Sequence, residues 1–113
     1  METKSHPIKL IYNFEQQSFK PDNVPEVKPG ESISFQLVTV PHRNADFRIT
    51  MDKTGYFKPS EAISSKTKMT LEMTLERQLE KEITYTCELI DPETNAVVIA
   101  SREGYGGGVR PGH

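Results

Sequence analysis

The sequence has a single cysteine, Cys87, and no tryptophan among its 113 residues. One cysteine excludes a disulfide within the chain, so the hydrophobic core must hold the fold, and a reducing compartment is favoured. No apolar run approaches the ~20 residues that a membrane-spanning helix needs, and the opening stretch METKSHPIKLIYNF has no apolar segment of signal-peptide length. We therefore expect a cytoplasmic protein without a membrane partner.

The sequence also lacks an excess of basic over acidic residues. The chain has 14 Lys and Arg against 16 Asp and Glu, which gives a formal net charge of −2. Proteins that bind nucleic acid usually carry a positive excess that replaces the counterions of the phosphates. The charge balance therefore argues against a nucleic-acid partner.

Alternation of apolar and polar residues dominates what is present. In residues 31–40, for example, Ile33, Phe35 and Leu37 alternate with polar positions, and the same period of two recurs along the chain. The expected strands are residues 7–14, 24–27, 31–40, 46–52, 69–75, 82–90 and 95–101. About seven short strands without a long helix predict an all-β fold, an antiparallel sandwich of two sheets.

The remaining segments are expected to connect these strands. Residues 53–66 are predicted to be a loop, and the charged residues 76–82 suit either a turn or a short helix. We expect a single sandwich domain over residues 1–103. The glycine-rich residues 104–113, GYGGGVRPGH, are expected to form a flexible C-terminal tail.

Two stretches carry a resemblance to known folds. VKPGESISFQL, residues 27–37, and the triplet Tyr85-Thr86-Cys87 resemble segments of immunoglobulin-like and cupredoxin-like β-sandwiches. This resemblance implies a Greek-key topology. Residues 18–39 and 97–105 also resemble the DP-EP family, whose members are predicted β-sandwiches with no assigned activity.

The cupredoxin resemblance raises the question of a metal site at Cys87. A blue-copper site needs two histidines and a cysteine thiolate, usually with an axial methionine. The loop after Cys87, ELIDPETNAVV, contains neither histidine nor methionine, and His6 and His113 lie near the termini. Only His42 is placed loosely like a ligand. We expect a metal-free protein without a cofactor, with Cys87 buried as a small apolar side chain. The alternative is a mononuclear metal or electron-transfer protein that uses His42 and Cys87.

A catalytic site is a second alternative. His42, Arg43 and Asp46 form a polar group on a predicted loop, which could act in acid–base chemistry. However, G-x-S-x-G, H-E-x-x-H and calcium-loop motifs are all absent from the sequence. We therefore expect no enzymatic activity and assign no catalytic residue. Tyr85 is expected to act structurally, as a tyrosine corner whose hydroxyl bonds to the backbone.

The C-terminal tail is the most suggestive segment outside the predicted core. Tyr105, Val109 and Arg110 are spaced by glycines, and such a segment can extend over another chain or add to a sheet edge. We expect a binding or assembly module whose partner is another protein or a second copy of the chain, as in a homodimer. Deletion of residues 104–113 is then expected to weaken association while leaving thermal stability nearly unchanged.

Overall fold

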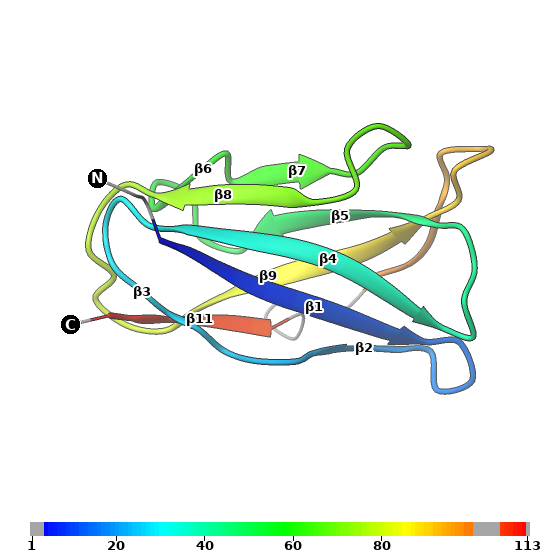
Figure 1. Ribbon diagram of the computed structural model, residues 1–113, viewed down its shortest axis with the longest axis horizontal. Helices are drawn as coiled ribbons and strands as arrows, with labels where there is room; N and C mark the ends of the chain where they lie inside the picture. The colour runs from blue at the N-terminus through cyan, green and yellow to red at the C-terminus, as the bar shows by residue number, and fades with distance from the viewer. Residues whose placement is uncertain (1–3, 101–106, 113) are drawn as a thin grey trace.

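A computed structural model describes residues 4–100 and 107–112, and the strands within them form two sheets packed face to face (Figure 1). The first sheet follows the order β2 (Ser18–Pro21), β1 (Ser5–Asn13), β4 (Ser32–Val40), β8 (Leu71–Leu75) and β6 (Phe57–Lys58). The second follows the order β3 (Glu26–Val27), β11 (Gly107–Pro111), β9 (Ile83–Ile90), β5 (Asp46–Met51) and β7 (Glu61–Ile63), and β10 (Val97–Ala100) also pairs with β9. The predicted all-β sandwich is confirmed.

The number of strands is higher than the sequence predicts. All seven expected strands form, but β2, β6, β7 and β11 fall in segments expected to be connections, a loop or a tail. These four strands have two to five residues each, which is too short for a period of two to be recognised. Residues 76–82 have no regular secondary structure, so neither a helix nor a strand forms there.

The sheets are mixed, and the prediction of purely antiparallel sheets is wrong. β1 and β4 pair in parallel over nine residues, from Ser5 opposite Ser32 to Asn13 opposite Val40. β3 and β11 also pair in parallel. The parallel pair forms because the chain leaves the first sheet after β2, contributes β3 to the second sheet, and then returns as β4. Hydrophobic alternation reports burial of one face, which is typical of antiparallel sheets but does not fix the direction of a strand.

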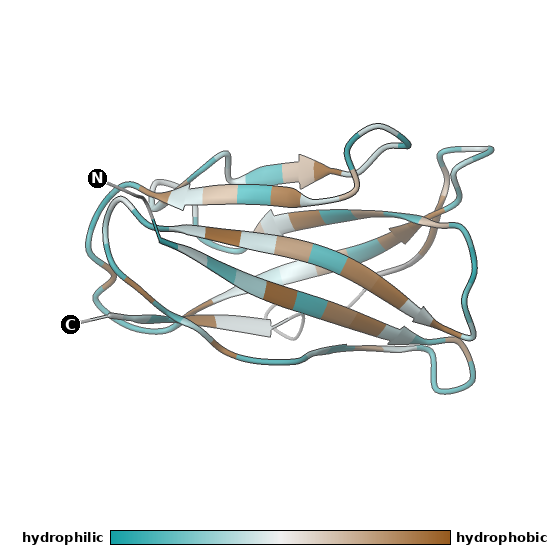
Figure 2. Ribbon diagram, in the orientation of Figure 1, coloured by the Kyte–Doolittle hydropathy of each residue, from teal (hydrophilic) through white to brown (hydrophobic). Residues whose placement is uncertain are grey.

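The core lies between the sheets and follows the predicted alternation. In Figure 2, apolar and polar bands alternate along β1 and β4. The inward positions of β5 and β9 are all almost completely buried, as predicted. The core cluster consists of Ile8, Leu10, Val27, Ile33, Phe35, Phe47, Ile49, Met51, Phe57, Leu71, Met73, Leu75, Leu79, Ile83, Tyr85, Cys87 and Val109.

β11 corrects the predicted domain boundary. Its residues pair with β9 on one side and with β3 on the other, and Val109 is fully buried in the core. Residues 107–111 of the expected flexible tail are therefore a strand of the sandwich. The glycines led to the prediction of a flexible tail, but here they permit close packing. A Cβ atom on Gly107 would overlap the ring of Tyr85. The described residues contain no helix with the length and hydrophobicity that a membrane crossing requires.

Candidate functional site

Cys87 lies in the middle of β9 with its side chain in the core. It is fully buried and pairs across the sheet with Ile49. Burial raises the pKa of the Cys87 thiol to about 12, and the negative charge of Asp52 contributes in the same direction. A metal ligand or a nucleophile is the thiolate, which this environment disfavours. The expectation of a buried, apolar Cys87 is confirmed.

His42 does not lie with Cys87. It is exposed in the loop between β4 and β5, and this loop precedes Asp46, which pairs with the last residue of β9, Ile90. Cys87 is three residues further back along β9, roughly 10 Å from Ile90 at the rise of a strand. In the described part of the chain, there is no group of three or more His, Cys, Asp or Glu side chains suited to a metal ion.

The polar residues beside His42 are directed to different partners. The Arg43 guanidinium lies 4.4 Å from the ring centroid of Phe14, in a cation–π contact. Asp46 accepts a hydrogen bond from the Ser64 hydroxyl at 2.9 Å, and this hydroxyl accepts one from the Phe47 backbone N–H. His42, Arg43 and Asp46 therefore do not form the polar cluster that an acid–base site would require.

The three residues expected to bind a partner have different environments. Val109 is fully buried and contributes to the core, so its side chain is not accessible to a partner. Arg110 is exposed and its Nε lies 3.3 Å from Glu82 Oε1. Tyr105 lies outside the described residues. The structure thus removes Val109 from the candidate interaction site and leaves Arg110 at the surface.

Tyr85 is an interior residue rather than a tyrosine corner. Its ring packs edge-on against Phe35, with 4.9 Å between the ring centroids. The hydroxyl is buried and has no hydrogen-bond partner among the residues that the structure describes. Burial raises the pKa of Tyr85 well above its ordinary range, so the phenol stays protonated.

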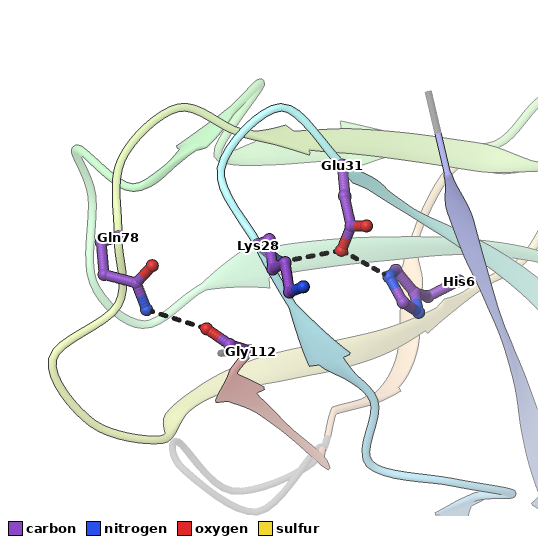
Figure 3. A network of polar contacts seen from close by, with 5 residues as sticks. All are labelled: His6, Lys28, Glu31, Gln78 and Gly112. Carbon is purple, nitrogen blue, oxygen red and sulfur yellow. Dashed lines mark hydrogen bonds and ion pairs between the residues drawn. The ribbon is translucent and has the colours of Figure 1, made fainter. Parts of the chain in front are cut away.

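A polar network at one end of the sandwich was not predicted from the sequence (Figure 3). His6 Nε2 lies 3.0 Å from Glu31 Oε1, and the same oxygen accepts a hydrogen bond of 2.9 Å from the Lys28 backbone N–H. Since an ionised carboxylate only accepts, Nε2 of His6 is the donor. These contacts hold the pKa of Glu31 below its ordinary value, with the His6 hydrogen bond as the largest cause.

The register of β1 and β4 creates this network. Ser5 lies opposite Ser32, so His6 and Glu31 come together although 25 residues separate them. Beside them in Figure 3, the Gln78 side chain donates to the Gly112 carbonyl at 3.3 Å. Both contacts connect a strand terminus to a neighbouring loop, so their evident contribution is to the fold. No local sequence pattern predicts either of these two contacts.

A second polar group lies on the outer face of the six-stranded sheet. The Asp52 carboxylate accepts hydrogen bonds from Thr84 Oγ1 at 2.5 Å and Thr86 Oγ1 at 2.7 Å. On the same face, Arg48 lies 3.6 Å from Glu88 and 3.7 Å from Glu61. These contacts join β9 to β5 and to the segments that follow β5, and they make this face strongly polar.

The exposed apolar side chains are the remaining candidates for recognition. On the outer face of the five-stranded sheet, Val38 and Val40 are 40% and 46% exposed, and Ile11 is the cross-strand neighbour of Val38. We call these three residues the valine patch. A second pair, Val97 and Val98 on β10, is 45% and 60% exposed. Both groups are β-branched residues on strands.

Comparisons with protein-family models, with curated proteins and with solved structures found no match for this chain. The resemblances to immunoglobulin-like, cupredoxin-like and DP-EP proteins therefore stay predictions.

Proposed function

We propose that this chain is a cytoplasmic, non-catalytic binding or assembly module, which recognises a protein partner or a second copy of itself through the surface of its sheets. The observation that carries this proposal is the exposure of adjacent β-branched side chains on strands, above all in the valine patch. Apolar groups at the surface gain about 25 cal/mol per Å² when a partner covers them. Contiguous exposed apolar groups are a property of interaction surfaces.

The separation of the reactive side chains supports a non-catalytic role. Cys87 is buried and protonated, while His42 is exposed at the end of the sandwich. The two alternatives, a metal or electron-transfer protein using His42 and Cys87 and an enzyme using the His42 loop, gain no specific support from this arrangement. The negative net charge favours a protein over a nucleic acid as the partner.

The double variant Val38→Thr/Val40→Thr tests the valine patch. Threonine preserves β-branching, so the exposed strand should fold as before while the patch loses its hydrophobic character. We expect binding of a stoichiometric protein partner, measured by sedimentation, to weaken about tenfold or more. Gln36→Thr, on the same face of β4, is the matched control and should bind like the wild type.

The function would need revision if the purified full chain neither associated with itself nor retained a stoichiometric partner. An association that the double variant left unchanged would exclude the valine patch alone as its site.

A further inference from the structure

Within the residues that the structure describes, β10 lies at an open edge of the six-stranded sheet. β5 pairs with β9 along residues 85–90, so β10 and β11 share the opposite edge of β9. β11 is covered in turn by β3, whereas β9 is the only strand that pairs with β10 among the described residues. The pairing of β10 with β9 shifts register between Val97 and Ile99, and both Val97 and Val98 are exposed.

The other sheet edges carry the features that prevent strands from pairing between molecules. Edge strands are commonly blunted by charged residues, by proline or by short length. Each of the other four edge strands contains a charged residue: Lys20 in β2, Glu26 in β3, Lys58 in β6 and Glu61 in β7. β3 and β6 also have only two residues each, and β2 ends at a proline. β10, with the sequence VVIA, has neither a charge nor a proline, although it is as short as β2 and its pairing with β9 shifts register between Val97 and Ile99.

This difference in charge indicates which kind of strand can pair with β10. When two identical strands pair antiparallel about a two-fold axis, each strand meets its own sequence. The charged edges would bring like charges close together, which is destabilising. In β10 every cross-strand pair would be apolar against apolar, and the exposed backbone groups of one copy would complement those of the other.

We propose that β10 is a self-recognition edge, at which a second copy of this chain pairs antiparallel and joins the two six-stranded sheets into one. This inference rests on the proposed assembly function, and it adds to the valine patch a second surface, β10, whose partner is a second copy of the chain. Four residues on each side are a small contact compared with a standard interface. The dimer is therefore reversible and weak, and it forms at about 0.1–1 mM protein.

Charge substitutions at Val98 test this surface. Near the two-fold axis, Val98→Lys or Val98→Glu places like charges next to each other, so each variant alone should dimerise at least about tenfold more weakly in sedimentation equilibrium. An equimolar mixture of the two variants should recover association, because the charges across the interface are then opposite. Such recovery cannot arise from misfolded protein. Met69→Lys, at an exposed apolar side chain before β8 that belongs neither to β10 nor to the valine patch, is the matched control and should dimerise like the wild type.

Hydrogen exchange gives an independent measurement. In the wild type, amides of residues 97–100 that face away from β9 should gain protection as concentration rises, and Val98→Lys should remove the gain. A wild type that is monomeric at about 1 mM overturns the inference. So does a dimer that Val98→Lys leaves intact; in that case self-association through another surface would still support the proposed function.

Discussion

Gly107 and Tyr85 lie opposite each other at the junction of β11 and β9. A Cβ atom on Gly107 would come within 2.5 Å of Tyr85 Cζ and still closer to its hydroxyl oxygen. The φ angle of Gly107 is +154°, in a region that other residues rarely adopt. At the residue scale, an aromatic ring thus occupies the space that a glycine leaves open, a combination that stabilises glycine-containing strands.

At this scale we predict that Gly107→Ala is destabilising by about 2–4 kcal/mol, from overpacking and backbone strain together. Denaturant unfolding of the purified protein measures the effect. Gly108→Ala is the matched control, because the atoms nearest to its Cβ would belong to the flexible side chain of Glu82, at 3.1 to 3.3 Å. Equal stability of the two variants would contradict the close packing of Tyr85 on Gly107.

At the scale of single strands, β11 determines how the C-terminal segment contributes to the stability of the fold. Val109 fills the core, while Arg110, the next residue, lies at the surface with Glu82. We predict that Val109→Ala costs about 2 kcal/mol, from lost apolar burial and a small cavity. Arg110→Ala should change stability by less than about 0.5 kcal/mol, because exposed ion pairs contribute little.

Thermal unfolding of both variants measures this difference, and deletion of residues 104–113 extends it. Deletion removes β11, uncovering part of the β9 edge, so it is expected to lower the melting temperature markedly. An unchanged melting temperature after deletion would show that β11 is not a strand of the folded sandwich. The earlier expectation of unchanged stability assumed a tail outside the core.

The connections between the sheets are also decided at this scale. The chain crosses from the five-stranded to the six-stranded sheet after β2, β4, β6 and β8 (Figure 1). Pro25 and Pro59 lie in these crossings, where a missing backbone N–H costs little. Because the crossing segments are only a few residues long, no hydrophobic pattern in the sequence predicts them.

At the scale of the whole molecule, the His6–Glu31 contact connects the start of β1 to the turn before β4 (Figure 3). The pKa of Glu31 is lowered in the folded state by the His6 hydrogen bond, the Lys28 backbone N–H and the nearby charges of His6 and Lys4. A group with a lowered folded pKa contributes stability above its unfolded pKa, and this contribution is lost as pH falls through the folded value.

We therefore predict that the wild type is more stable than Glu31→Gln above pH 4.5, the ordinary pKa of this carboxyl, and that the advantage shrinks as the pH falls below it. Melting temperatures across pH 2–7 measure the difference. Glu93→Gln, in the exposed turn between β9 and β10, controls for the loss of one carboxyl. A constant difference between wild type and Glu31→Gln at every pH would argue against the contribution of this contact.

The candidate sites show where sequence prediction stops. The burial of Cys87 could be predicted, because alternation along residues 82–90 places it on the inward face. The separation of His42 from Arg43 and Asp46 could not, since Arg43 and Asp46 contact Phe14 and Ser64, which come from other parts of the chain. The role of Val109 was mistaken because the glycines around it suggest flexibility, while the space they leave is filled by residues far away in the sequence.

The sequence alone determined which face of each long strand is buried, since a period of two is a local property that apolar burial enforces. It also excluded an internal disulfide by the number of cysteines. Only the tertiary structure decided the parallel pairing of β1 with β4 and the places of β10 and β11 along one edge of β9. These features depend on backbone hydrogen bonds between distant segments, and such bonds are available to almost any residue type.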